Sequence, residues 1–303
     1  MADTWLTDAF NLPPLAPRVG PFPGRDWLAT WWAHRGSGEL MIGDTGDCLV
    51  ALVRRGDRVE FAGEPDLTDY HSPLGSPSVP ALTKLVAGFP EGVSLVLDSL
   101  PREAANAVSD ALRDIGLSPA CEQHTVAAVL DLPATFDAYL AGIGKKDRHE
   151  LRRKRRRFDR EVGPAQLERR SGRGAVSLFA DLHRQSSGDK GDFMTREIEE
   201  FFVALHTEAG GVVDVLVDGS GRACSVIFSF EDEEGFYLYN SAFDPDMIQL
   251  SPGNVMLSLL IERAIAEGKH VFDFLKGDER YKFRLGAKTR PLYRVTATTG
   301  EHT

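Results

Sequence analysis

YLYNSAFDPDMIQLSPGNVMLSLLIERAIAEGKHVFDFLKGDERYKFRLGAKTRPLY, from Tyr237 to Tyr293, is the stretch that decides the fold class of this chain. It predicts a strand, a phosphate-type loop, a helix over 252–267, a strand over 271–275 and a short polar-aromatic segment. Ser251-Pro252-Gly253 joins an N-cap residue, a proline suited to the first helical position and a glycine. We therefore expect a helix whose first N–H groups are open to an anion.

The same order of elements recurs along the chain. Residues 136–140 and 145–160 read as helices that lead into the second half. The remaining second-half elements are helices at 175–185 and 196–209 and a strand meander at 212–217, 223–230 and 235–243, followed by the stretch above. The first half has a helix from Arg25, strands at 39–42, 48–53 and 58–62, a helix at 79–89, a strand at 93–97, a helix from Pro101 to Gly116 and a strand at 125–132. Residues 1–24, rich in proline, are expected to extend over the surface.

This recurrence predicts a doubled α/β fold of the α+β type. Each of two tandem units would be a mixed, mostly antiparallel sheet flanked by helices, with a cleft between the units. A length of 303 residues suits two domains, and we place them at residues 1–132 and 133–303.

Composition excludes several classes of protein. No window approaches the ~18 apolar residues of a membrane span, and the N-terminus, with Asp3 and Asp8, lacks the basic start of a signal peptide. The sequence therefore predicts a soluble cytoplasmic protein. Three scattered cysteines and scattered histidines indicate neither a disulfide framework nor a metal site. A net charge of −10 argues against a protein that coats DNA.

The charge is unevenly distributed. Residues 145–157 contain nine Lys or Arg against Asp147 and Glu150, which gives this segment +7 and leaves −17 for the rest of the chain. It reads as a helix with a narrow apolar stripe, and phosphate groups would relieve its repulsion, with Arg152, Arg153 and Arg156 as candidate contacts. A solvated face neutralised by the acidic remainder is one alternative, and nonspecific DNA binding is another.

A polar loop in the first half is a second candidate contact region. Asp69, Tyr70 and His71 follow a predicted strand, where substrate contacts are often found. The other interpretation is that such residues only shape turns.

The second half resembles the CelD/BcsL-type acyltransferases of the GNAT superfamily, which are related to the FemAB-like aminoacyl transferases. The residues that carry the resemblance are KKDRHELRRKRRRF from Lys145, AFDPDMIQLSPG from Ala242 and FDFLKGDERYKFRLG from Phe272. It covers the chain well from Phe136 onward, and WLATWW and TDYHSPL extend it weakly into the first half. It implies two GNAT-like units, the first of them degenerate, with the acyl donor bound by the second.

The resemblance also implies site residues. The donor pyrophosphate would sit at Gln249 to Asn254, a loop with one glycine where the family pattern has two. The expected donor-binding residues are Tyr239, Asn240, Ser251, Gly253, Asn254 and Val255. Lys282 lies in a segment that looks like the Phe-Lys-x-x-Phe-Gly motif of FemAB-like proteins.

Acyl transfer to an amine defines the chemistry these residues would perform. The amine must lose a proton, and the developing oxyanion must be stabilised. Asp273, Asp278 and Glu279 are candidate bases or positioning groups, and Lys282 would hold phosphate or stabilise the oxyanion. Tyr281 and Tyr239 are candidates to protonate the leaving group. The alternative is structural, with Asp278 capping a short helix and Lys282 paired with Asp273.

Three functions follow as hypotheses. The first is an N-acyltransferase that moves an acyl group, most simply acetyl, from acyl-CoA to an amine on a small molecule, sugar or peptide, in polysaccharide or cell-envelope metabolism, without a metal. The second is a FemAB-like aminoacyl transferase that uses charged tRNA, whose phosphates the basic helix would bind. The third is a non-catalytic binding protein with the same fold, which the single glycine favours. The acceptor and the oligomeric state stay open.

Overall fold

The computed structural model describes residues 5–300, so Asp3 lies outside it. The chain forms two compact units. Unit 1 comprises Met1–Ala127 and Arg290–Thr303, and unit 2 comprises Ala128–Thr289. The sequence predicted a division after residue 132, and the chain passes from unit 1 to unit 2 after Ala127. Residues 290–303 were expected in the second domain but group with unit 1, because strand β12 (Lys288–Thr298) pairs there with strand β5 (Ser94–Leu100).

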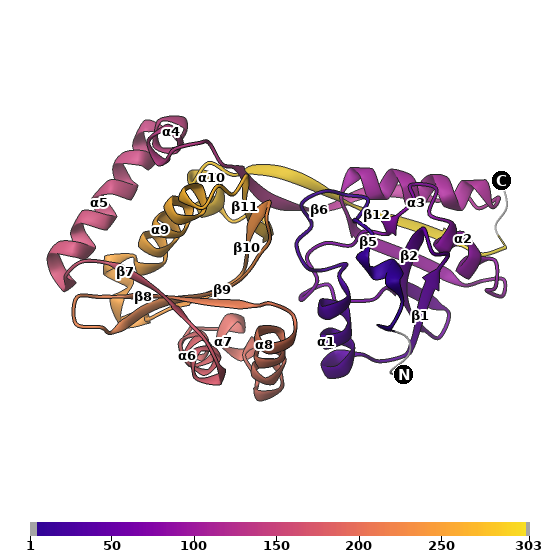
Figure 1. Ribbon diagram of the computed structural model, residues 1–303, viewed down its shortest axis with the longest axis horizontal. Coiled ribbons are helices and arrows are strands. Elements are labelled where there is room, and N and C mark those ends of the chain that lie inside the picture. The colour runs from indigo at the N-terminus through magenta and orange to yellow at the C-terminus, as the bar shows by residue number, and fades with distance from the viewer. Residues whose placement is uncertain (1–4, 301–303) are drawn as a thin grey trace. The chain divides into compact units, whose positions relative to one another are not determined.

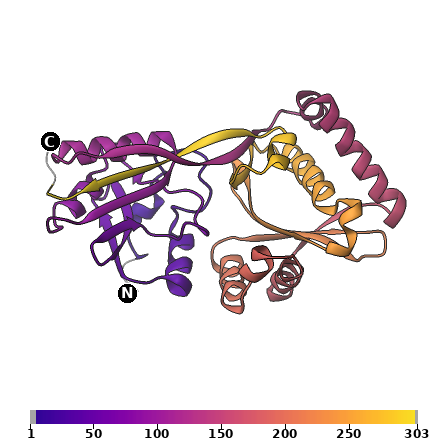
Figure 2. The same ribbon diagram turned by 180° about the vertical axis from the view of Figure 1, so that it is seen from behind.

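The described elements of unit 1 begin with a short 3₁₀ helix and end with a long strand. They are η2 (Asp8–Asn11), α1 (Arg25–Arg35), β1 (Glu39–Asp44), β2 (Cys48–Arg55), β3 (Arg58–Phe61), β4 (Leu74–Gly75), α2 (Pro80–Val86), β5 (Ser94–Leu100), α3 (Arg102–Asp114) and β6 (Ala120–Asp131). Helices α2 and α3 contact each other, α2 packs against β1 and β2, and α3 packs against β5 (Figure 2).

The elements of unit 2 follow in the same manner. They are α4 (Phe136–Gly142), α5 (Lys145–Val162), β7 (Gln166–Arg170), α6 (Arg173–Arg184), α7 (Asp189–Phe193), α8 (Arg196–Glu208), β8 (Val212–Val217), β9 (Ala223–Glu231), β10 (Gly235–Phe243), η3 (Pro245–Leu250), α9 (Pro252–Ala266), β11 (Val271–Lys276) and α10 (Arg280–Arg284). Strand β12 (Lys288–Thr298) begins in unit 2 and belongs to unit 1 from Arg290 onward. Helix α9 covers one face of strands β9 and β10, and α6 packs on the same strands from the opposite face (Figure 1).

The two units repeat one strand pattern. In unit 1, β1–β2 and β2–β3 pair antiparallel and β3–β5 pair parallel. In unit 2, β8–β9 and β9–β10 pair antiparallel and β10–β11 pair parallel. A helix that starts with proline, α2 or α9, connects each parallel pair, as a right-handed crossover requires a connection of this length. The predicted doubled α/β fold is confirmed.

The repeat extends to unusual backbone conformations. The residue before each helix-starting proline is left-handed, at Val79 (φ 46°) and Ser251 (φ 53°). The ends of β5 and β11 carry left-handed Ser99 (φ 58°) and Leu275 (φ 59°). Since non-glycine residues rarely adopt this conformation, its recurrence at equivalent places marks the same turn built twice.

Several elements were missed from the sequence. The segment after β11, predicted only as a short polar-aromatic segment, forms α10 and β12, and residues 166–170 form an edge strand. The proline-rich start does not simply cover the surface, because Ala16, Val19 and Phe22 are fully buried. Proline spacing indicates an absence of regular structure, but it carries no information on burial.

Candidate functional site

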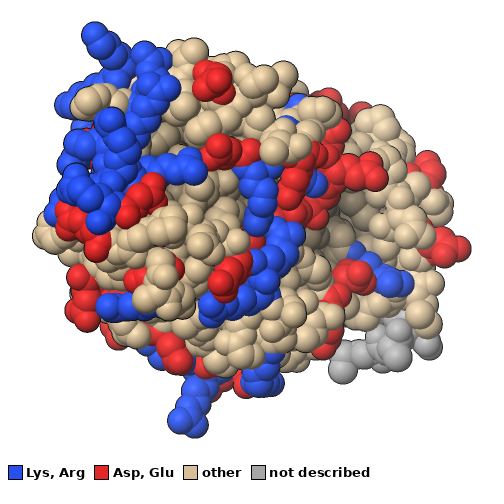
Figure 3. Space-filling model, turned by 60° about the vertical axis from the view of Figure 1, so that its left-hand side comes forward, with Lys and Arg blue, Asp and Glu red and all other residues tan. Residues whose placement is uncertain are grey.

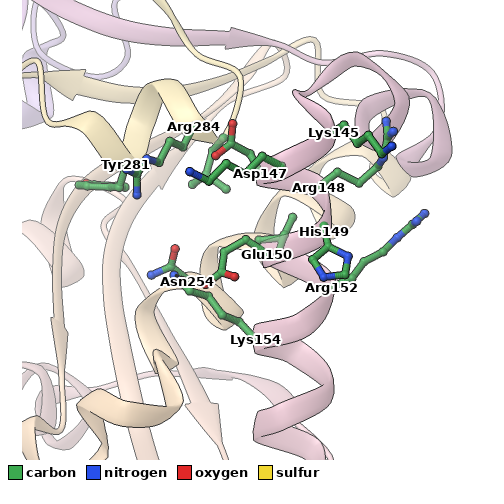
Figure 4. A pocket seen from close by; sticks show the side chains of 13 residues that line it. Lys145, Asp147, Arg148, His149, Glu150, Arg152, Lys154, Asn254, Tyr281 and Arg284 are labelled. Atoms are coloured by element: carbon green, nitrogen blue, oxygen red, sulfur yellow. Dashed lines mark ion pairs between the residues drawn. The ribbon is translucent and has the colours of Figure 1, made fainter.

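A large cavity lies in unit 2 beside α5, the start of α9 and α10. Its volume is about 1290 Å³. Six of its lining residues are Lys or Arg, and two are Asp or Glu. Cations thus outnumber anions in the lining, which suits a ligand that carries phosphate groups, although Lys145, Arg148 and Arg152 point away from α9 and α10 (Figure 4).

Helix α5 is anchored by a few contacts and leaves two faces free for function. Leu151 and Phe158 are buried, and Arg155 Nη1 lies 2.8 Å from Glu262 Oε2 on α9. These contacts turn Asp147, Glu150 and Lys154, spaced three and four residues apart, toward α9 and α10 (Figure 4). We call these three residues the inner face of α5.

The opposite side of α5 carries cations. Figure 4 shows Lys145, Arg148 and Arg152 pointing away from α9 and α10. Arg156 continues the same spacing, and Figure 3 shows the dense group of Lys and Arg on this face of the molecule. We call Lys145, Arg148, Arg152 and Arg156 the cationic stripe. Among residues 5–300 none of the four forms an ion pair with Asp or Glu. Arg148 instead donates to the carbonyl oxygen of Leu140 at 2.8 Å, and Arg156 to that of Arg152 at 3.3 Å.

The two inner-face carboxylates differ in their partners. Glu150 accepts two hydrogen bonds from Arg153, at 2.8 and 2.7 Å, and this pairing lowers the pKa of Glu150. Within the described part of the chain Asp147 makes no ion pair. Burial lowers the pKa of Lys154. Of the two inner-face carboxylates, Asp147 is thus the one that no described cation holds in an ion pair.

The start of α9 offers one backbone donor near the cavity, since the N–H groups of Ser251 and Asn254 already donate to carbonyl oxygens. The Ser251 side chain does not cap the helix, and Pro252 has no N–H to offer. The N–H of Gly253 donates to no group among the described residues. A Cβ at Gly253 would meet only Phe243 Cδ1, at 3.9 Å, so the side-chain position of Gly253 is open. Asn254 lines the cavity next to it. An uncapped N-terminus of a 15-residue helix favours an anion.

Helix α10 supplies Tyr281 and Arg284. Both line the cavity, and Figure 4 shows them across from the inner face of α5. Burial, with a smaller effect of the Glu279 charge, raises the pKa of Tyr281. Burial therefore favours the neutral hydroxyl, which can donate a hydrogen bond into the cavity.

Of the catalytic residues expected from the sequence, the structure brings only Tyr281 to the cavity. Lys282 is buried and lies 2.9 Å from Glu279 Oε2, where the sequence-based alternative expected Asp273 as its partner. Asp273 is fully buried, and its Oδ1 accepts from the N–H of Leu275 at 2.7 Å. Asp278 is exposed in the loop before α10.

The expected donor-binding residues divide in the same way. Asn254 lines the cavity, and Ser251 and Gly253 adjoin it. Tyr239 instead packs among Phe202, Phe228 and Phe230. Asn240 Oδ1 lies 3.2 Å from His183 Nε2, and Val255 is part of the core.

The remaining predicted contacts lie in different places. Arg152 lines the cavity, Arg153 is held by Glu150, and Arg156 lies further along the stripe. Asp69, Tyr70 and His71 belong to unit 1, where Tyr70 and His71 are buried.

Sequence reasoning missed most of the cavity wall. The missed lining residues are Lys145, Lys146, Asp147, Arg148, His149, Glu150, Leu151, Lys154, Arg284 and Leu285. Their signal was present in helix periodicity, which separates 147, 150, 151 and 154 from 145, 148, 152 and 156. The net charge of the segment, on which the prediction was based, does not distinguish these two faces.

Residues 5–300 lack two features that would point to other functions. They contain no helix long and apolar enough to cross a membrane. Nor do residues 5–300 hold a group of three or more His, Cys, Asp or Glu side chains that could bind a metal ion.

Comparison with known families bears directly on unit 2. Residues 145–283 match the family described as acetyltransferase (GNAT) domain. Unit 2 contains a GNAT-type acetyltransferase domain. The matched region begins with the first residue of α5 and ends one residue before the end of α10. It therefore includes α5, α9 and nearly all of α10, the three helices around the cavity. This match supports a transferase role.

Solved structures share the fold of the whole chain. A conserved protein of unknown function from Bacteroides thetaiotaomicron has a TM-score of 0.67 at 11% identity, covering 96% of this chain and 95% of its own. FemX has a TM-score of 0.65 at 12% identity, covering 94% of this chain and 93% of its own. L-PGS from Bacillus licheniformis has a TM-score of 0.60 at 14% identity, covering 94% of this chain and 95% of its own. Identities this low show a common fold only. No curated protein matches the chain in sequence.

Proposed function

We propose that the chain is an N-acyltransferase that binds an acyl-CoA at the cavity of unit 2 and transfers its acyl group to an amine. The observation that carries this proposal is the convergence on one cavity of an uncapped helix N-terminus with Lys154 and Arg284. Coenzyme A carries phosphates, which these groups would bind through charge-assisted hydrogen bonds.

The same cavity supplies an acid and a base. Asp147 would take the proton of the attacking amine, because its carboxylate is not held in an ion pair within the described residues. Tyr281 would protonate the leaving thiolate, because its side chain lines the same cavity and its hydroxyl can donate a proton. Lys282, buried away from the cavity, would fix α10 and thereby position Tyr281 and Arg284.

Unit 1 would contribute no second donor site. In the equivalent helix α2, Ala81 and Leu82 take the places of Gly253 and Asn254 and are fully buried. The α2 start is therefore packed where the α9 start is open. This supports the interpretation of unit 1 as a degenerate GNAT-like unit. The CelD/BcsL assignment, an acceptor in polysaccharide or cell-envelope metabolism and the cytoplasmic location remain predictions.

A calorimetric titration with acetyl-CoA and free CoA tests the donor. Gly253 and Gly174 are each the second residue of a helix, and each has room for a side chain. We expect saturable binding to the wild type, at least 10-fold weaker binding to Gly253→Trp and unchanged binding to Gly174→Trp. If the wild type binds neither acetyl-CoA nor free CoA, acyl-CoA is ruled out as the donor. Binding without acyl transfer to any amine would favour the non-catalytic alternative.

A second donor class is favoured by the cationic stripe. Lys145, Arg152 and Arg156 are exposed and Arg148 is half-buried along about three turns of α5, and the described acidic side chains leave all four unneutralised. A row of cations at a spacing of about one turn, ~5.4 Å, suits the phosphates of a nucleic acid strand. An aminoacyl-tRNA would bring both an acyl group and such a backbone.

A further inference from the structure

Unit 1 contains a small polar cavity that the proposed acyl transfer does not use. Its volume is about 200 Å³. The polar residues that line it are Arg55, Glu60, Glu64, His71 and Asp98, from β2, β3, the loop after β3 and β5.

His71 is held there in one orientation. Its Nδ1 lies 2.9 Å from the carbonyl oxygen of Asp98, and its backbone N–H donates to the carbonyl oxygen of Ser99 at 3.0 Å. The ring stacks on Phe61, with 5.1 Å between ring centroids. A carbonyl oxygen can only accept, so Nδ1 carries the proton, and in the neutral ring Nε2 presents a lone pair.

This lone pair is buried without a partner. The His71 side chain is 9% exposed, and Nε2 makes no hydrogen bond within residues 5–300. Gly63 keeps the space before it free, since a Cβ there would lie 2.8 Å from Nε2. Buried polar atoms usually have a partner, so an acceptor fixed this firmly points to a ligand that donates a hydrogen bond.

The charges around the cavity are already paired. Arg55 lies 3.2 Å from Glu60, and Glu64 is held by Arg35 at 3.1 Å. Asp98 Oδ2 lies 4.0 Å from Arg294 Nη2, and its Oδ1 accepts from the Ser99 hydroxyl at 2.9 Å. The ligand therefore does not need to supply a charge, while guanidinium donors and carboxylate acceptors line the same space.

We propose that this cavity binds a neutral, hydroxyl-bearing small molecule whose O–H donates to His71 Nε2. At ~30 Å³ for each water-sized group, the cavity holds roughly six such groups, which suits a polyol or part of a sugar ring. This site is separate from the donor cavity, and the inference stands whether or not unit 2 transfers acyl groups.

Nitrogen-15 spectra of the histidine rings test the proposal on the full chain. The His71 Nε2 resonance is identified by its loss in His71→Phe, which keeps an aromatic ring on Phe61, or in His71→Gln if the first variant does not fold. The probes are glycerol and glucose, with ethylammonium as a cation and acetate as an anion. We expect glycerol and glucose to shift the Nε2 resonance saturably, and ethylammonium and acetate to leave it unchanged.

The matched control is His270→Phe, which removes an exposed ring in unit 2. It should leave glucose affinity unchanged, whereas His71→Phe should weaken it at least 10-fold. A shift with ethylammonium or acetate alone would overturn the neutral class of ligand. No shift with any probe would overturn the site.

Discussion

The ammonium nitrogen of Lys282 lies 2.5 Å from the carbonyl oxygen of Lys276, at the point where β11 ends. It also lies 3.4 Å from the carbonyl oxygens of Leu275 and Gly277. Leu275 is in the left-handed conformation, which a leucine rarely adopts. One buried cation therefore stabilises a strained strand end and fixes the loop that leads into α10.

Replacing Lys282 with methionine should destabilise the protein before it affects chemistry. The variant keeps the side-chain volume but leaves buried carbonyl groups without a donor, which costs about 1–3 kcal/mol of unfolding free energy. Denaturant unfolding measures this loss. Donor affinity should fall as well, because Tyr281 and Arg284 follow on the same helix.

Lys288→Met is the matched control. This lysine is 80% exposed and lies 3.7 Å from Asp131, so its removal should change stability by less than about 1 kcal/mol. If Lys282→Met has wild-type stability and loses only turnover, the sequence-based hypothesis of a chemical role for Lys282 is correct and the positioning role is wrong.

Asp147→Asn should lower kcat by roughly 10²–10⁴-fold, the usual range for loss of a general base, with little change in donor affinity. Its rate should keep rising with pH, because more of the amine is then deprotonated without help. Steady-state kinetics against pH measure both effects. Asp137→Asn, at an exposed position in the first turn of α4, should behave like the wild type. An unchanged pH profile in Asp147→Asn would exclude it as the base.

The fold was largely predictable because its signals are local. Strands Val212–Val217 and Gly235–Phe243 agree with the prediction to the residue, since apolar runs between glycine and aspartate turns define them. The strand β12 was not predictable in this way. Lys288, Arg290 and Arg294 interrupt its apolar pattern, and its partner β5 lies nearly 200 residues earlier in the sequence.

The site was predictable only where one element carries the signal. The open start of α9 at Gly253 follows from three adjacent residues. The cavity wall does not, because it combines α5 with α10, which lies more than 100 residues later. Lys282 shows the limit of a motif: a lysine in a family-like segment is equally suited to bind a ligand or its own backbone, and burial decides between them.

Tyr139 should make the protein sensitive to alkali. Burial raises the pKa of Tyr139, whose hydroxyl donates to the carbonyl oxygen of Leu285 at 3.0 Å. As pH rises past about 10, the unfolded chain loses this proton before the folded protein does, so the free energy of unfolding falls. Tyr139→Phe should show a shallower fall, although it is about 1 kcal/mol less stable at neutral pH. Thermal unfolding from about pH 7 to 11 measures both, and the two curves should run parallel below about pH 9. A slope above pH 10 equal to that of the wild type would contradict the prediction.

The cationic stripe makes the choice between donors measurable. Reversing Arg152 and Arg156 to glutamate should weaken the binding of tRNA, because two phosphate contacts are lost. The slope of the logarithm of the binding constant against the logarithm of the salt concentration should become smaller by about one to two. Arg157→Glu with Arg160→Glu is the control, since it makes the same charge change on the same helix at residues already paired with Glu161. If the stripe contacts phosphates, the double variant at Arg152 and Arg156 should lose much more tRNA affinity than the double variant at Arg157 and Arg160. Equal losses would mean that only net charge matters. Loss of tRNA binding together with unchanged acetyl-CoA affinity would separate the stripe from the donor cavity.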